Sequence, residues 1–146
     1  MPSVHASAVL VGARAVLIRG PSGAGKSRLA LALLDVAARG QVPFARLVAD
    51  DRSHLEPHHG RLLVRPAPQI AGLIEVHGLG IRRLPHEPVA VVGLVVDLAA
   101  PDGERLPAAA SGRVTIDGVA VTRLAVAAAA DPLPLVLAAL SSAATG

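Results

Sequence analysis

The sequence predicts an α/β domain that contains more strands than a regular βαβ alternation would give. Short runs of Val, Leu and Ile recur along the chain and are separated by Gly, Pro and Asp, which is typical of strands joined by turns. Only two segments have a helical pattern. A glycine-rich loop, "GPSGAGKS", lies between an apolar run and the first of these helices. The length of 146 residues is that of one ordinary domain, which we expect to span residues 1–146.

Two strands and a helix are predicted around the glycine-rich loop. Residues 5–11 and 15–19 are rich in Val, Leu and Ile, and a Gly-Ala turn separates them. Residues 27–39 carry Leu and Ala on one helical face, and Gly40 follows them as a stop signal. The loop at residues 20–25 therefore connects a strand to a helix.

Further strands are expected in the middle of the chain. Residues 45–49 form a short apolar run, and residues 54–64 have the pattern of a hairpin. Residues 72–81, "GLIEVHGLGI", indicate a strand that leads into a glycine-rich turn. Residues 89–98 are continuously apolar, which predicts a strand at the centre of the sheet.

The C-terminal third is predicted to contain a surface loop, a hairpin and a helix. Residues 100–112 are rich in Pro, Gly and Ala and form the loop. Residues 113–124 form the hairpin, with an Asp-Gly turn at residues 117–118. The last helix follows Asp131 as its N-cap, with Pro132 at its first position.

The composition excludes several classes of function. Cysteine is absent, which excludes disulfides, thiolate metal sites and thiol nucleophiles. The net charge is +3, but the arginines are scattered and there is no Tyr or Trp on which bases would stack, so we expect no nucleic-acid partner. Prolines and Asp131 interrupt the apolar C-terminal run, and the N-terminus lacks the pattern of a signal peptide, so we expect a cytoplasmic protein without a membrane partner.

The chain is apolar for a soluble monomer. Its mean hydropathy is +0.54, and Phe44 is its one aromatic residue. The core must therefore be aliphatic. The hydropathy has two explanations that the sequence leaves open, namely apolar surface buried between subunits and a composition that is simply rich in alanine.

The stretch "GPSGAGKS" matches the phosphate-binding pattern G-x-x-x-x-G-K-[ST] in full, and it has the strand and helix that this pattern requires. Glycine allows the backbone N–H groups to form a concave nest for phosphate oxygens at the helix N-terminus. Lys26 is the only lysine of the chain; it supplies a compact ammonium, which the broad fork of arginine does not replace. The hydroxyl of Ser27 suits Mg²⁺. The predicted nucleotide-binding residues are Gly20, Pro21, Ser22, Gly23, Ala24, Gly25, Lys26 and Ser27.

A phosphate loop needs an acid near its metal and a group that handles the proton of the acceptor. Two apolar runs end in aspartate, one at Asp50 and Asp51 and the other at Asp97. We favour the first pair, because adjacent carboxylates can face the metal and the acceptor separately, and we interpret Asp97 as a strand-end residue that caps a turn. Glu75 lies within a predicted strand, either on its surface face or as a second metal-facing carboxylate.

The histidines show no zinc-binding spacing. His58 and His59 lie at a predicted hairpin tip, where we expect them to be solvated. His5 differs, because its strand is expected to run beside the strand that enters the phosphate loop.

Three segments together resemble the catalytic domain of HPr kinase/phosphorylase. They are "GPSGAGKS", "LVADDR" and "IEVHGLGI", in this order, with His5 preceding Lys26 by 21 residues. This family phosphorylates a serine of the phosphocarrier protein HPr with ATP and can reverse the reaction. The resemblance covers residues 5 to about 126 and is strongest for the short alphaproteobacterial form. It implies a P-loop α/β fold related to phosphoenolpyruvate carboxykinase, and homo-oligomers, commonly hexamers.

The resemblance also implies roles for individual residues. Lys26 and the loop glycines would hold the phosphates of ATP, and Ser27 and Glu75 would serve Mg²⁺, with Asp50 beside them. Asp51 would be the general base for the acceptor serine, and His5 would lie near the reacting phosphate. The catalytic residues are thus expected to be His5, Lys26 and Asp51.

The chain departs from the family pattern at several places. It begins almost at the catalytic histidine, so we expect no N-terminal regulatory domain. Arg28 stands where an acid is usual, and His77 where an arginine is usual. The segment that carries a catalytic arginine in the family is short here, and neither Arg82 nor Arg83 is assigned that role. "AAAADPLP" replaces a basic loop tied to dephosphorylation, so kinase activity is better supported than phosphorylase activity.

Three functions remain in competition on the sequence. The favoured one is an ATP- and Mg²⁺-dependent serine kinase of HPr that regulates the phosphotransferase system. A small-molecule P-loop kinase is less favoured, because no helical lid with arginines is evident. A nucleotide-binding regulator without transfer activity is favoured by the missing arginine and basic loop.

Overall fold

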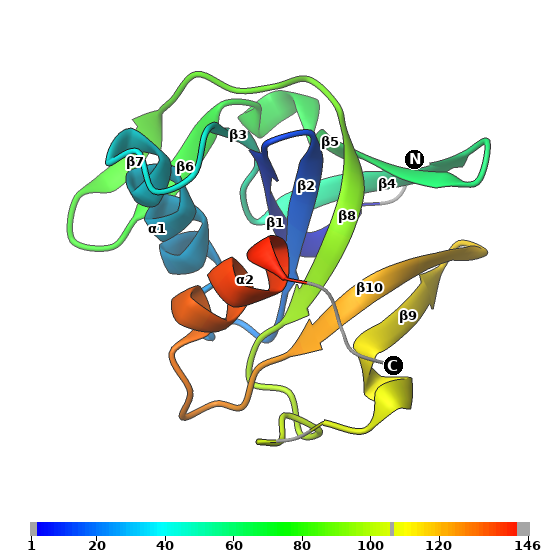
Figure 1. Cartoon of the computed structure of the whole chain (residues 1–146). Helices are drawn as coiled ribbons and strands as arrows, with labels where there is room; N and C mark the ends of the chain where they lie inside the picture. Colours follow the sequence, from blue (N-terminus) through cyan, green and yellow to red (C-terminus); the bar gives the residue numbers. More distant parts are fainter. Residues whose placement is uncertain (1–2, 106, 143–146) are drawn as a thin grey trace.

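The structure is a computed structural model that describes residues 3–105 and 107–142, and it is a strand-rich α/β fold (Figure 1). Its strands are β1 (Ser3–Val11), β2 (Arg14–Arg19), β3 (Ala45–Ala49), β4 (Arg52–His58), β5 (Arg61–Pro66), β6 (Leu73–Val76), β7 (Gly80–Arg83), β8 (Ala90–Asp97), β9 (Arg113–Ile116) and β10 (Val119–Ala125). The strands predicted from apolar runs are all confirmed, with outer bounds that differ by at most two residues.

Two α-helices, α1 (Lys26–Ala38) and α2 (Pro132–Ser141), accompany short 3-10 helices at Pro68–Ile70 and Ala109–Gly112. The second 3-10 helix lies within the segment predicted to be a surface loop. The N-terminus of α2 is capped as predicted, because the Asp131 carboxylate accepts a hydrogen bond of 3.2 Å from the Leu133 N–H. Among the described residues, neither helix has the length and apolarity that a bilayer span requires.

The larger sheet closes on itself. Its main path runs β2-β1-β4-β5-β8-β10-β9, β3 pairs with β1, and β2 also pairs with β8. β8 is central, as predicted, because it pairs in parallel with β2 and β10 and antiparallel with β5. β2 and β8 are not consecutive in the chain, which explains why a simple βαβ alternation does not describe this sequence.

The sheet separates two aliphatic cores. One core lies between the helices and the β1-β2-β8 face and includes Val16, Ile18, Leu33 and Val96. The other lies on the opposite face, inside the ring that β4 and β5 complete. Both cores consist of Ala, Val, Leu and Ile, as the composition predicts, while Phe44 is 38% exposed.

β6 and β7 form a separate two-stranded ribbon. The ribbon packs on the protein through β6, because Ile74 is buried in the helix-side core. β7 is exposed along its length, and Ile81 is 63% exposed. The sequence predicts the first strand and the glycine-rich turn of this ribbon, and the structure adds its second strand.

β1 brings the segments of the site together. One of its edges pairs with β2, with Ala6 opposite Arg19. Its other edge pairs with β4 at the start of β1, where His5 lies opposite Arg52, and with β3 from Ala8 onward. The end of β2, where the glycine-rich loop begins, and the junction between β3 and β4 therefore lie on either side of β1.

Candidate functional site

The glycine-rich loop, residues 20–25, links the end of β2 to the start of α1. Gly23 and Gly25 have φ angles of 83° and 99°, which are strained for residues with a Cβ. A Cβ at either position would meet no heavy atom within 4 Å, so backbone conformation rather than crowding requires glycine there. Gly20 is constrained differently, because an added Cβ would lie 3.2 Å from the Leu98 carbonyl oxygen. The loop is thus closely packed at its start and open above its end.

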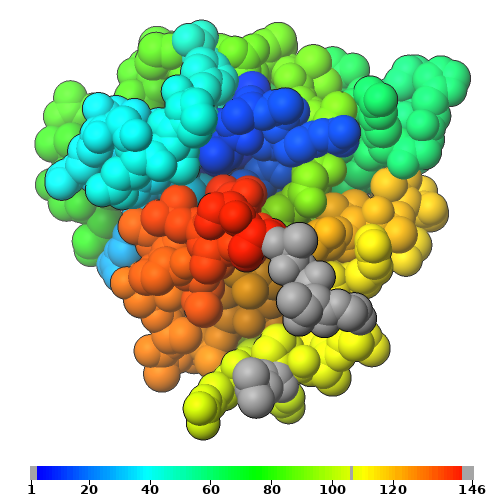
Figure 2. Space-filling model, viewed as in Figure 1, coloured from blue at the N-terminus to red at the C-terminus, as the bar shows by residue number. Residues whose placement is uncertain are grey.

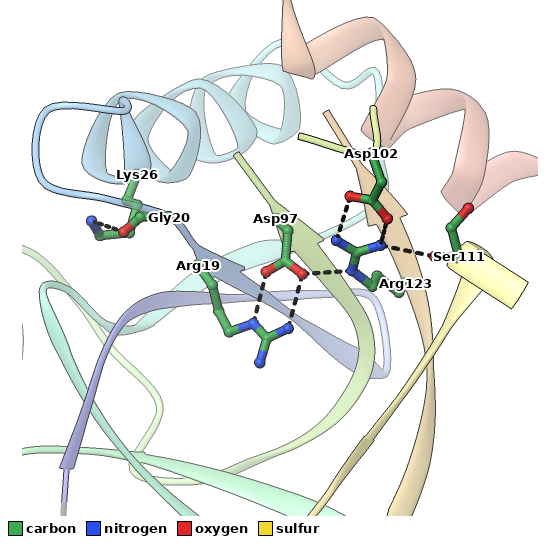
Figure 3. A network of polar contacts seen from close by, with 7 residues as sticks. All are labelled: Arg19, Gly20, Lys26, Asp97, Asp102, Ser111 and Arg123. Atoms are coloured by element: carbon green, nitrogen blue, oxygen red, sulfur yellow. Dashed lines mark hydrogen bonds and ion pairs between the residues drawn. The ribbon is translucent and has the colours of Figure 1, made fainter. Parts of the chain in front are cut away.

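Lys26 folds back over this loop (Figure 3). Its Nζ donates hydrogen bonds of 2.8 Å to the Gly20 carbonyl and 3.2 Å to the Pro21 carbonyl. The first helical hydrogen bond at this end runs from the Leu29 N–H to the Gly25 carbonyl, so the N–H groups at the start of α1 have no acceptor within the helix. The loop, Lys26 and the helix end form a region of positive potential that suits phosphate oxygens.

Asp50, directly after β3, is the centre of the polar site. Its Oδ1 accepts hydrogen bonds from the hydroxyls of Ser27, at 2.6 Å, and Ser7, at 2.7 Å. Its Oδ2 accepts one of 3.1 Å from the backbone N–H of Glu75. Asp50 is 5% exposed, so these three donors satisfy a buried carboxylate. The contacts join the end of β3 to α1, β1 and β6.

Asp51 has a different environment from Asp50. Its φ angle of 69° is in the left-handed region, which aspartate tolerates better than most residues, and the residue is exposed. Its carbonyl accepts a hydrogen bond of 3.1 Å from the Ala6 N–H, and its own N–H donates to the Ser7 hydroxyl at 3.2 Å. The two adjacent aspartates are therefore separated into a buried acceptor and an exposed residue, which the sequence does not distinguish.

The other predicted site residues lie around these aspartates. Glu75 is exposed, and it is its backbone N–H that contacts Asp50. His5 is exposed on β1, which lies beside β2 as predicted and pairs with it antiparallel. His5 lies opposite Arg52 of β4. His58 and His59 are exposed at the β4–β5 turn, as predicted.

The oxygens at the site fit a magnesium–phosphate ligand. Within residues 3–105 and 107–142, no group of three or more His, Cys, Asp or Glu side chains is arranged to hold a metal ion. Mg²⁺ does not need such a group, because it keeps several waters and binds phosphates together with one or two protein oxygens. Ser27 gives its hydrogen to Asp50, which leaves its oxygen lone pairs available to a cation. The donor set therefore fits Mg²⁺ carried by a phosphorylated ligand.

Asp97 belongs to an ion-pair network (Figure 3). Arg19 makes a bidentate contact with Asp97, at 2.7 and 2.8 Å, and Arg123 joins it at 2.6 Å. Arg123 also binds Asp102 with two hydrogen bonds of 2.7 and 3.0 Å. Burial opposes ionisation of Asp97, but the two arginines outweigh it and hold the pKa of Asp97 below its ordinary value. Asp97 is a strand-end residue, as expected, but its side chain links three strands rather than capping a turn.

Sequence reasoning misses this network and Ser7. In the sequence, Arg19 is only a residue before the loop and Asp97 only the end of an apolar run. The ion pair between them becomes evident only when β2 is known to pair in parallel with β8. Ser7 has a weak signal as well, since it is a polar residue within an apolar strand.

Two cavities lie away from the glycine-rich loop. One, of about 610 Å³, is lined by residues of α1 and by Leu84. The other, of about 400 Å³, lies between the β1–β2 turn, the segment after α1, and α2, which meet on the face shown in Figure 2.

Several curated proteins that are similar to this chain are named HPr kinase/phosphorylase. The chain is 42% identical over 80 residues to "HPr kinase/phosphorylase" of Halalkalibacterium halodurans, which covers 54% of this chain and 24% of that protein. It is likewise 42% identical over 80 residues to "HPr kinase/phosphorylase" of Limosilactobacillus reuteri, with coverage of 54% and 23%. The match to the Exiguobacterium protein of that name is 42% over 82 residues, with coverage of 56% and 24%. The matched part of the chain thus spans about a quarter of the length of these relatives.

A solved structure extends the similarity to most of the chain. The "Hpr(Ser) kinase/phosphatase from Coxiella burnetii" superposes with a TM-score of 0.71 at 28% identity, and covers 94% of this chain and 91% of that one. The fold is therefore that of this kinase domain, as the sequence predicts. The family model of the HPr Serine kinase C-terminal domain matches residues 1–85, which contain the loop, both aspartates and Glu75. The chain belongs to the HPr serine kinase C-terminal domain family.

Proposed function

We propose that this protein is an ATP- and Mg²⁺-dependent serine kinase that acts on the phosphocarrier protein HPr. The observation that carries the proposal is the hydrogen bond of 2.6 Å between Ser27 and Asp50, which joins the glycine-rich loop to the paired aspartates. Relatives named HPr kinase/phosphorylase support the acceptor and the reaction. In this proposal the loop is a P-loop, and the fold is related to that of phosphoenolpyruvate carboxykinase.

The nucleotide would bind to residues 20–27. The N–H groups at the start of α1 would donate to the phosphate oxygens, and Lys26 would exchange the Gly20 and Pro21 carbonyls for phosphate. Ser27 would bind Mg²⁺, oriented by Asp50, and Glu75 would contribute a further oxygen. When bound, Mg²⁺ neutralises charge that develops on the phosphates.

Asp51 would act as the general base. Its carboxylate is exposed beside the buried Asp50, where an acceptor hydroxyl can reach it. It would take the proton of the acceptor serine as the serine oxygen bonds to the γ-phosphorus and the bond to ADP breaks. His5 would lie near the transferring phosphate, since its neighbour Ala6 donates a hydrogen bond to the Asp51 carbonyl.

The proposal also covers the direction of transfer, the cellular context and the oligomeric state. Transfer to HPr is the favoured direction, because the segment after β10 lacks the family's basic loop; the reverse, phosphorylase reaction would return the proton through Asp51. The protein would act in the cytoplasm, in regulation of the phosphotransferase system, as a homo-oligomer. Exposed Leu79 and Ile81 supply apolar surface that is consistent with an interface.

The test is transfer of labelled phosphate from Mg·[γ-³²P]ATP to purified HPr. We expect the wild-type protein to label a serine, and Asp51→Asn to lower the rate by about 100-fold or more while ATP affinity is retained. Asp117→Asn is a matched control, because Asp117 is also an exposed aspartate with positive φ, in the β9–β10 turn.

The other outcomes identify the competing functions. ATP binding without label on HPr would contradict the kinase proposal and favour a nucleotide-binding regulator. Release of ADP with small hydroxylated or acidic metabolites, but not with HPr, would identify a small-molecule kinase.

A further inference from the structure

Ser7 is a buried polar residue in an apolar strand. It lies in β1 with 0% exposure, between Ala6 and Ala8, which both pack into the core that β4 and β5 enclose. Successive side chains of a strand point to opposite faces, so Ser7 points toward the other side, where Asp50 and Ser27 lie. A buried hydroxyl costs stability unless it is hydrogen-bonded, so its partners indicate what it does.

Both partners of Ser7 are site aspartates. Its hydroxyl donates to Asp50 Oδ1 at 2.7 Å and accepts from the Asp51 N–H at 3.2 Å. The hydroxyl has one hydrogen and two lone pairs, so its hydrogen and one lone pair are engaged. One atom of β1 thereby sets the carboxylate of Asp50 and the backbone of Asp51 relative to each other.

Each contact constrains a different part of the site. Asp50 Oδ1 is shared between Ser7 and Ser27, so Ser7 helps to hold the oxygen toward which the Ser27 hydrogen points. Asp51 has left-handed backbone geometry, which persists only where its surroundings hold it. The Ser7 hydroxyl supplies one of these contacts and the Ala6 N–H another.

We infer that Ser7 is a positioning residue that fixes the metal-side and base-side aspartates in one arrangement. This inference rests on the proposed function for its effect on phosphoryl transfer. Ser7 touches neither nucleotide nor acceptor in this role. It acts by keeping the lone pairs of Ser27 turned toward the cation and the carboxylate of Asp51 turned outward.

The chain contains a matched control in Ser53. This serine in β4 is also 0% exposed and is also hydrogen-bonded, but its hydroxyl donates to the Ala6 carbonyl at 2.9 Å and not to an aspartate. Ser53→Ala removes the same group from a comparably buried position. A merely structural role for Ser7 predicts that Ser7→Ala and Ser53→Ala behave alike.

The experiment measures three quantities for the wild type, Ser7→Ala, Ser7→Cys and Ser53→Ala. They are kcat and KM for phosphoryl transfer to HPr, the affinity for ATP with Mg²⁺ and with EDTA by calorimetry, and the melting temperature. We expect Ser7→Ala to lower kcat by about 10- to 100-fold with little change in the KM for HPr, as for residues that orient metal ligands. Mg²⁺ should raise the affinity for ATP relative to EDTA, and we expect this increase to be about 10-fold smaller in Ser7→Ala than in the wild type.

The controls separate positioning from stability. Ser53→Ala should leave kcat and the Mg²⁺-dependent gain within about twofold of the wild type, even where its melting temperature falls as much as that of Ser7→Ala. Ser7→Cys keeps a weak donor and should lie between Ser7→Ala and the wild type. If Ser7→Ala does not fold, the comparison of Ser7→Cys with Ser53→Ala decides by the same criteria.

Two results would overturn the inference: wild-type values of kcat and Mg²⁺-dependent affinity in Ser7→Ala, or equal losses in Ser7→Ala and Ser53→Ala. A wild-type protein that binds Mg·ATP but labels no HPr would instead contradict the proposed function. In that case the calorimetric comparison still tests Ser7, because it requires no transfer.

Discussion

Arg19 and Asp97 face each other across paired strands β2 and β8, in register, and share two hydrogen bonds of 2.7 and 2.8 Å. Arg123 on β10 binds the same carboxylate, so one acid joins three adjacent strands. Arg19 is the last residue before the glycine-rich loop, and its carbonyl accepts from the Leu98 N–H at 2.8 Å. The network therefore fixes the strand end from which the loop departs.

Replacement of Asp97 should destabilise the fold strongly. Asp97→Asn removes the carboxylate that Arg19 and Arg123 share and leaves Arg123 paired with Asp102 alone. The Arg123 and Asp97 side chains are only 14% and 16% exposed. We expect a loss of about 3 kcal/mol in the free energy of unfolding, measured by urea denaturation. Asp35→Asn removes a surface i,i+4 pair with Arg39 and should cost less than about 0.5 kcal/mol. Equal costs for both substitutions would contradict a stabilising role of the network.

Acid stability should depend on the same carboxylate. The folded pKa of Asp97 is lowered, so its contribution is fully present above the unfolded pKa, about 3.9, and is lost as the pH falls through the lower folded pKa. The wild type should therefore lose stability below about pH 4 more steeply than Asp97→Asn does. Thermal unfolding at a series of pH values measures this, and parallel curves for the two proteins would exclude the contribution.

Lys26 should be required for nucleotide binding and not for folding. Within residues 3–105 and 107–142, the ammonium donates to the carbonyls of Gly20 and Pro21 in the loop and to no carboxylate, so Lys26→Met should keep the melting temperature. Loss of a charge-assisted contact to phosphate should weaken ATP binding by about 10- to 100-fold in calorimetry. Arg28→Met removes an exposed charge from the same turn of α1 and should leave ATP affinity nearly unchanged. If Lys26→Met and Arg28→Met weaken ATP binding equally, then the positive charge of the region, and not a specific contact of Lys26, attracts the nucleotide.

Gly25 should be needed for its backbone angle. Gly25→Ala introduces a Cβ at a φ of 99° with no steric contact nearby, and should cost about 1 kcal/mol of stability. Gly12→Ala, in the β1–β2 turn at a φ of 64°, should cost a similar amount for the same reason. Only Gly25→Ala should also weaken ATP binding, because only Gly25 precedes the N-terminus of α1. Unchanged ATP affinity in Gly25→Ala would mean that the loop reaches its conformation without glycine there.

Local patterns predict most elements of this fold. The loop, α1, β8 and the Asp131 cap of α2 follow from apolar periodicity and turn residues that lie close together in the chain. The closed path through β2, β1, β4, β5 and β8 does not follow, because it depends on pairings between distant segments. Sequence patterns specify a strand more readily than its partner.

The same limit applies to the site. The two adjacent acids after an apolar run favour Asp50 and Asp51 over Asp97, and the structure places Asp50 beside Ser27. This signal is visible in the sequence because the two acids are neighbours in the chain. Ser7 is 43 residues from Asp50, and Arg19 is 78 residues from Asp97, so neither contact is visible before the strands are paired. Residues that orient others across strands are the ones that sequence reasoning misses.

One edge of β1 pairs with both β3 and β4, and this arrangement determines where the chain can gain or lose residues. Insertions between α1 and β3, at residues 39–44, would lengthen a surface connection while the Ser27–Asp50 contact is kept by the strands on either side. A single residue gained or lost within β1 would instead turn Ser7 and His5 to the opposite face of the sheet. Related chains should therefore vary freely in the separation of loop and aspartates, yet keep a constant count from the histidine to the end of β1.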